Sequence, residues 1–199
     1  MIWLLALAQS TAPTATNMAD LFRAEDTPVA IMPGNVLKSV NTAVTVTPQG
    51  KIQDCKVEVS SGIQKLDAHT CALLIRRAKF QPAIDRDGTS IYGVYRTQID
   101  WWVGDGYPPR GRTIPEMSLT VKALPAKTKS PAVLRLMFRV DASGHVSDCS
   151  LQDKKGDPAL VKLGCEELVK SYTATPARNL AGALVASVQT ATVLFEVRP

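Results

Sequence analysis

Two copies of one pattern lie along this chain, and this repeat limits its possible folds more than any other feature of the sequence. A shift of 94 residues places Gly50 on Gly144 and Cys55 on Cys149 without a gap. The same shift aligns further pairs of identical residues, at positions 54 and 148, 62 and 156, 66 and 160, 71 and 165, 82 and 176, and 103 and 197. We therefore expect two similar modules, residues 41–104 and residues 131–199. Residues 105–130 are rich in Gly, Pro and Lys, which is typical of a linker.

The four cysteines form two pairs of equal spacing, each with fifteen residues between its members. Four cysteines allow three disulfide connectivities. If the modules are equivalent, each closes its own pair, which predicts the disulfides Cys55–Cys71 and Cys149–Cys165. A loop of this size is worth about 3 kcal/mol in the chain-entropy account, which matters because so small a core is marginal. The alternatives are four reduced, buried thiols, or a zinc site, although zinc ligands usually come in closely spaced pairs.

The first half of each module has the pattern of a β-hairpin followed by a helix. Apolar residues recur at every second position in residues 55–59 after a turn at residues 48–50, which predicts a hairpin. In residues 66–78 they recur at steps of three and four, which predicts an amphipathic helix. The second copy supports the helix, because Asp157 is a natural N-cap and Pro158 suits the first helical position.

Each module closes on a further strand, which makes it a ββαβ unit. Residues 91–103 alternate, and we expect the face with Arg96, Gln98 and Asp100 to see water. Residues 117–121 also alternate and predict an edge strand before the second module. The fold class that follows is α+β, with two tandem ββαβ modules, each a small antiparallel sheet with one helix packed on it.

The N-terminal residues have the composition of a targeting segment and a leader. Residues 1–8 are an apolar run that ends in a small-x-small pattern, as a secretory signal does, but the run is short and no basic residue precedes it. We expect the true start to lie upstream, where a membrane anchor could also be encoded, and the protein to be periplasmic. The run is too short to span a bilayer, which takes about 20 apolar residues. Residues 9–40 are predicted to be a flexible leader.

The sequence shows no pattern of an enzyme, a metal site or a nucleic-acid-binding protein. The net charge of +5 is spread along the chain rather than gathered in one basic patch. His69 and His145 are the only histidines, and neither lies in a metal-binding or catalytic pattern. Asp54 and Asp148 repeat, and we expect both to bond nearby backbone N–H groups. We predict no catalytic residue, no metal ligand and no cofactor.

Residues 44–103 resemble the C-terminal domain of TonB, the inner-membrane protein that transmits energy to outer-membrane receptors. The string G-K-I-x-D-x-x-V-x-x-S-S-G is followed by L-D-x-H-x-x-A-L-L-I-R-R-A-x-F-x-P-A and a strand that ends in Trp-Trp. The second module, residues 137–197, keeps fewer of these residues. The resemblance implies a small α+β fold that binds an extended segment of a receptor by adding it as a strand beside the final strand of the sheet.

The strand that the resemblance singles out begins at residue 92 and ends at residue 102. An unpaired strand edge offers a row of N–H and C=O groups that a peptide can complete. The candidate peptide-binding residues are Tyr92, Val94, Arg96, Gln98, Asp100 and Trp102. The alternatives are an ordinary solvated edge strand, or a strand that pairs with the other module and so loses a peptide site.

We therefore expect a non-catalytic periplasmic protein that binds an extended segment of an envelope or TonB-dependent transport partner. Because the sequence shows neither the anchor nor the long proline-rich linker of an energy transducer, we do not expect energy transduction by this chain alone. The alternative is a structural protein that binds cell-wall polymer or anionic lipid and no nucleic acid. That alternative relies on the basic linker residues Arg110, Arg112, Lys122, Lys127 and Lys129.

Overall fold

The chain folds into an α+β structure, as the sequence predicts. It is a computed structural model that describes residues 9–32, 34–109, 111–126, 128–153 and 155–198. The signal-like segment at residues 1–8 lies outside the described residues. In the described part, no helix is both long and apolar enough to cross a membrane.

The first module consists of a hairpin, a helix and a long closing strand. Gly50 has a φ of 74° in the hairpin turn, a conformation that glycine adopts at low cost. The elements are β2 (Val36–Val46), β3 (Ile52–Val59), α1 (Gln64–Arg77), the short strands β4 (Phe80–Gln81) and β5 (Ala83–Ile84), and β6 (Ser90–Val103).

The second module repeats this order at a constant offset of 94 residues. Its helix begins at Pro158 where the first begins at Gln64, and both have 14 residues. The side chain of Asp157 accepts hydrogen bonds from the N–H groups of Ala159 and Leu160, as expected of an N-cap. The elements are β8 (Ala132–Val140), β9 (Val146–Leu151), α2 (Pro158–Ser171), β10 (Ala177–Arg178), β11 (Leu184–Val185) and β12 (Ser187–Val197).

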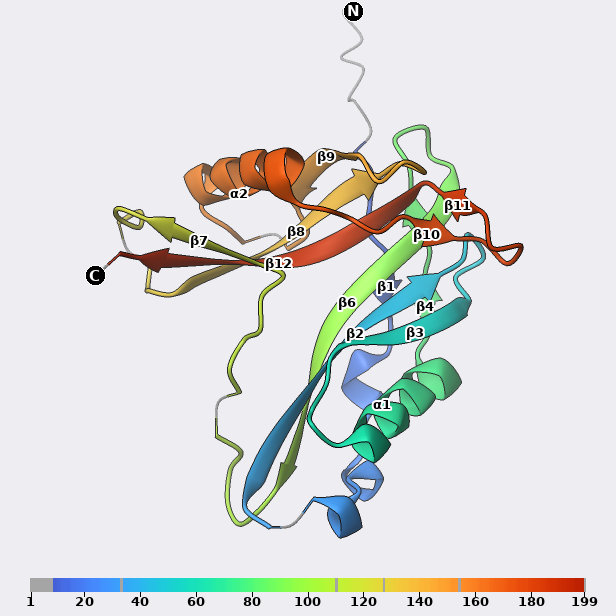
Figure 1. Ribbon diagram of the computed structural model, residues 1–199, viewed down its shortest axis with the longest axis vertical. Helices are drawn as coiled ribbons and strands as arrows, with labels where there is room; N and C mark the ends of the chain where they lie inside the picture. The colour runs from blue at the N-terminus through green and yellow to red at the C-terminus, as the bar shows by residue number, and fades with distance from the viewer. Residues whose placement is uncertain (1–8, 33, 110, 127, 154, 199) are drawn as a thin grey trace, which may run out of the picture.

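The two modules share one sheet: each keeps the small antiparallel sheet that we expected, and the closing strands pair with one another, which was one of the alternatives. In the described part of the chain the strand order is β3-β2-β6-β12-β8-β9, and pairing is antiparallel within each module. The closing strands β6 and β12 join the modules by parallel pairing (Figure 1). The backbone groups along the facing edges of β6 and β12 would otherwise be unpaired, and here they pair with one another.

The helices cover opposite faces of this shared sheet. Tyr95 of β6 belongs to the same buried cluster as Leu74 of α1, so its face is turned to α1. Phe195 of β12 packs against Gly164 of α2. Gln189 lies on the same face of β12 as Phe195, and it pairs with Val94 of β6. Val94 and Tyr95 are adjacent in β6, so they lie on opposite faces of the sheet. Since paired residues of neighbouring strands point to the same side, the α2 side of the sheet continues into the side of β6 that is turned away from α1.

Residues 9–40 are an integral part of the first module, not the flexible leader that we expected. Leu21 and Met32 are 0% exposed. Strand β1 (Thr14–Ala15) pairs with β4, and Arg77 of α1 binds the carboxylate of Asp26 through two hydrogen bonds. Three 3₁₀ helices follow β1, at Met18–Asp20, Ala24–Asp26 and Val29–Ile31. The small core of the module is completed by these residues, and β2 already begins at Val36.

Both predicted disulfides are present. Cys55 and Cys71 join β3 to α1, with a Cα–Cα distance of 5.6 Å. Cys149 and Cys165 join β9 to α2 in the same way, with a Cα–Cα distance of 5.3 Å. Each module therefore ties its helix to its own hairpin.

Candidate functional site

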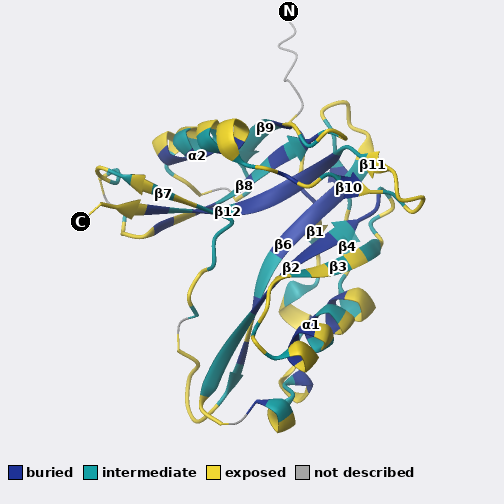
Figure 2. Cartoon of the chain, viewed as in Figure 1, coloured by how far each residue is buried: buried dark blue, intermediate teal, exposed yellow. Residues whose placement is uncertain are grey.

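The first part of the predicted peptide-binding strand is not an open edge. Tyr92, Gly93 and Val94 of β6 lie opposite Ser187, Val188 and Gln189 of β12. Figure 2 shows both strands buried where they meet. The alternative that the strand pairs with the other module therefore holds for Tyr92 and Val94, which are unavailable to a peptide.

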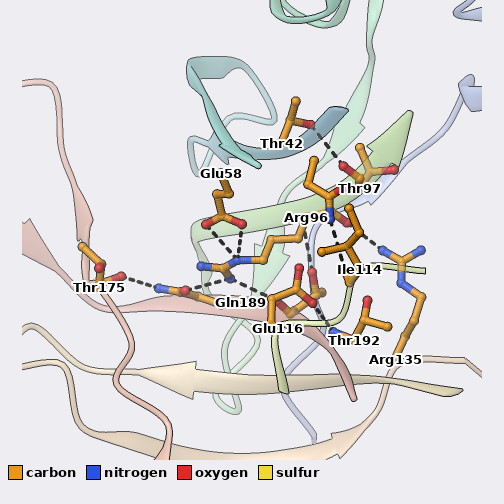
Figure 3. Close-up of polar contacts among 12 residues, drawn as sticks. Thr42, Glu58, Arg96, Thr97, Ile114, Glu116, Arg135, Thr175, Gln189 and Thr192 are labelled. Atoms are coloured by element: carbon orange, nitrogen blue, oxygen red, sulfur yellow. Dashed lines mark hydrogen bonds and ion pairs between the residues drawn. The ribbon is translucent and has the colours of Figure 1, made fainter. Parts of the chain in front are cut away.

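Arg96 is buried at the junction of the modules, although we expected it to see water. The residue is 8% exposed. Nε donates to both carboxylate oxygens of Glu58 at 3.1 Å, and Nη1 donates to Gln189 Oε1 at 3.1 Å and to Thr190 O at 3.0 Å (Figure 3). Thr175, Pro176 and Ala177, which follow α2, line a pocket together with Arg96 on this side of the sheet.

Further hydrogen bonds complete this junction. Gln189 Nε2 donates to Thr175 O at 2.8 Å, and Arg135 Nη2 donates to Arg96 O at 2.8 Å. The guanidinium of Arg135 also lies 5.6 Å from the centre of the Tyr95 ring. Because these buried groups bind one another, the network fixes how the modules meet and has a structural rather than a catalytic role.

Beyond Val94 the strands diverge, and β6 keeps a strand partner on one side only. Ile99 to Val103 pair with β2, and no strand of the described residues pairs with their other side. A cavity of about 320 Å³ opens at this divergence, lined by Thr97, Gln98 and Asp100 of β6 together with linker and second-module residues. This part of β6 therefore offers an edge to which an extended chain could be added.

The predicted residues Gln98, Asp100 and Trp102 direct their backbone groups to this open edge. The N–H of Arg96 donates to Thr190 and its carbonyl accepts from Arg135, so its backbone groups point away from β2. The carbonyl of Thr97 accepts from Thr42 of β2. Backbone groups of successive residues point to opposite sides of a strand, so the even-numbered residues that follow Arg96 also face away from β2.

The linker reaches β6 through side chains. Gln98 Nε2 donates to Arg112 O at 3.1 Å, and Gln98 Oε1 accepts from the N–H of Ile114 at 3.1 Å. Asn41 Nδ2 donates to Ile114 O at 3.2 Å. The described linker residues thus bind β6 through side chains, and no backbone hydrogen bond joins them to the edge.

Comparison with known proteins identifies the first module. Residues 39–102 match the family model of the C-terminal domain of the Gram-negative bacterial TonB protein. This segment is similar to a TonB C-terminal domain. No curated protein and no solved structure matches the chain.

Domains of the TonB C-terminal family are protein-interaction domains of energy transduction, not enzymes, and they interact with outer-membrane transporters. The match ends within β6, so it includes the open edge almost to its end. It suggests an envelope-associated protein that acts through contacts with other envelope proteins. The matched segment and the open edge therefore lie in the same module.

The double serine of the matched segment, Ser60 and Ser61, is a structural clamp. The carboxylate of Asp67 accepts hydrogen bonds from Ser60 Oγ, from Ser61 Oγ at 2.7 Å and from Ser61 N at 2.9 Å. Burial pushes the pKa of Asp67 up, but the hydrogen bonds from Ser60 and Ser61 outweigh it and hold the pKa below its usual value. The clamp ties the end of β3 to the first turn of α1.

Most of the other residues considered in the sequence lie apart from the open edge, and Trp101, which lies within it, is buried. Trp101 is 3% exposed and donates from Nε1 to Thr70 Oγ1 at 2.9 Å. His69 Nε2 lies 2.8 Å from Asp26 O, in the first module. Asp148 forms an ion pair with Arg86 of the first module, which the sequence did not indicate. Among the described residues, no group of His, Cys, Asp or Glu side chains could hold a metal ion.

Sequence reasoning also missed Glu58 and Gln189. Gln189 binds Arg96 across the junction, and Glu58 binds Arg96 within the first module. In both pairs the partners are distant in sequence. One signal was available for Gln189: it shares the alternation of Ala191, Val193 and Phe195, which form an apolar face of the closing strand. A polar side chain there requires a buried partner.

Proposed function

We propose that this chain is a non-catalytic periplasmic protein that binds an extended segment of an envelope protein, such as a TonB-dependent transport partner, by strand addition. The site is the open part of β6, where Gln98, Asp100 and Trp102 turn their backbone groups away from β2. The observation that carries the proposal is this unpaired edge within a segment similar to a TonB C-terminal domain. Tyr92 and Val94 are excluded because they pair with β12, and Arg96 serves the junction.

The disulfides support a periplasmic location. Structural disulfides persist in oxidising compartments such as the bacterial periplasm and are rare in the cytosol. Each module of this chain has one. Export through a signal peptide agrees with this chemistry, and a protease-protection assay on intact and lysed spheroplasts would locate the protein.

A proline substitution tests the edge without disturbing the rest of the sheet. Proline at position 100 removes one N–H that faces the open edge, and β2 does not use that N–H. Peptides would first be selected from a random library on the intact protein. We expect Asp100→Pro to weaken their binding at least tenfold and Asp100→Ala, which keeps the N–H, to weaken it less than threefold. Equal effects of the two substitutions would contradict strand addition.

The second candidate is charge-driven binding to cell-wall polymer or anionic lipid. Arg112, Lys122 and Lys129 are exposed in the linker, as such binding requires; Arg110 and Lys127 lie outside the described residues. Salt separates the two functions. Binding by exposed charges falls steeply as ionic strength rises, whereas backbone pairing barely responds. Sedimentation with purified peptidoglycan and with vesicles of anionic lipid, each at low and high salt, would reveal this activity.

A further inference from the structure

The linker contains a strand that is added to the second module as a peptide would be. Strand β7 (Met117–Val121) pairs in parallel with the end of β12, and Met117 lies opposite Val193 and Val121 opposite Val197. Outside the ladder, Glu116 N donates to Thr192 O at 3.0 Å and Arg198 N donates to Val121 O at 3.1 Å. A short extended segment is thus held through its backbone along its whole length.

The side chains of β7 follow the pattern of a strand-addition ligand. Met117, Leu119 and Val121 pack against the buried core of the second module. Ser118 and Thr120 are exposed. Backbone pairing supplies affinity in this type of recognition, and alternate side chains supply specificity.

The repeat shows which part of the first module corresponds to this site. The 94-residue offset places Ile99–Val103 on Val193–Val197. The pairing registers of the two modules agree. Trp101 lies opposite Lys38 and Phe195 lies opposite Ala132, and the second pair follows from the first by the 94-residue offset. β7 therefore occupies, on the second module, the position that is open on the first.

We propose that β7 is a built-in ligand of the second module, which leaves the first module as the one site for an external segment. β7 also indicates the kind of segment that fits there: an extended stretch of five residues, apolar at alternate positions, that runs parallel to β6. Its apolar side chains would lie on the face of Ile99, Trp101 and Val103. The external site rests on the proposed function, whereas the role of β7 does not.

The test uses a labelled synthetic peptide with the sequence of residues 115–122 and the full chain. Met117→Asp/Leu119→Asp removes the apolar contacts of β7 and should release it from β12. Ser118→Asp/Thr120→Asp adds the same charge on the exposed side of the strand and is the matched control. Calorimetric titration should give one bound peptide per chain for the intact protein and the control, and two for the released variant.

The other outcomes separate the two proposals. A change from no site to one site would support the role of β7 and contradict the external site. One site in both proteins would support the external site and contradict the role of β7, and no binding by either protein would contradict both. If the double aspartate variant does not fold, Leu119→Ala replaces it. Partial release should then strengthen binding at the second site at least tenfold over the intact chain, and no change would overturn the role of β7.

Discussion

Asp67 illustrates how one carboxylate determines a local structure that the second module builds differently. In the first module it accepts hydrogen bonds from Ser60 and Ser61. In the second module the serines are absent, and Asp157 caps the helix through its own side chain. The residues that make the first module resemble its family are therefore in part residues that hold α1 to β3.

Asp67→Asn should destabilise the protein by about 1–3 kcal/mol, because it replaces charge-assisted hydrogen bonds by weaker ones. The measurement is urea unfolding, with the exposed Asp20→Asn as control. A loss as small as that of the control would contradict the clamp.

The pH dependence of stability follows from the same carboxylate. Its folded pKa is lowered, so its contribution is present above the ordinary pKa of 3.8 and is lost as the pH falls through the folded pKa. Arg77 likewise lowers the pKa of Asp26, so both groups act in one direction. The free energy of unfolding of the native protein should fall between about pH 5 and pH 2, and that of Asp67→Asn should fall less. Parallel curves would contradict this assignment.

Arg96→Met should cost about 3 kcal/mol, since it leaves the buried acceptors of Gln189 and Thr190 without their guanidinium donor. Arg139 also joins the modules, through Asp85, but its side chain is 28% exposed. Arg139→Met is therefore the control and should cost less than about 1 kcal/mol. If the two variants unfold at the same urea concentration, the Arg96 network does not stabilise the junction.

At the scale of elements, local sequence was sufficient for most of the fold. The hairpins, both helices, the closing strands and β7 follow from periods of two and of 3.6 residues, which depend on near neighbours. The disulfides followed from the repeat. Residues 9–40 were not predicted as structured, because their contacts with α1 and β4 are distant in sequence and their 3₁₀ turns have no apolar period.

The two disulfides close loops of equal length, so we expect removal of either one to lower the stability of the protein by a similar amount. Each bond joins cysteines 16 positions apart. Cys55→Ser/Cys71→Ser and Cys149→Ser/Cys165→Ser should each lower the free energy of unfolding by about 2–4 kcal/mol. Urea unfolding of the two variants, with the reduced native protein beside them, measures this. A pair whose removal costs nothing would show that its module does not need the bond.

At the scale of the whole molecule, the sequence left the junction as one alternative among several and could not give its register. Strand pairing between Tyr92–Val94 and Ser187–Gln189 links residues more than ninety positions apart, and no local pattern selects a parallel partner. The position of Arg96 depends on that pairing, which is why a residue expected in water is buried. The open edge could be predicted only as a whole strand, and the second module decides which part of it stays open.

The difference between the two closing strands is the centre of this account, and amide hydrogen exchange measures it directly. Asp100 and Trp102 should exchange quickly, because their N–H groups face an edge with no strand partner among the described residues. Leu194 and Glu196, at the equivalent positions of β12, should exchange slowly because β7 pairs with them. A selected peptide should slow Asp100 and Trp102 to the rates of Leu194 and Glu196. Equal rates at the two pairs in the protein without peptide would contradict the account.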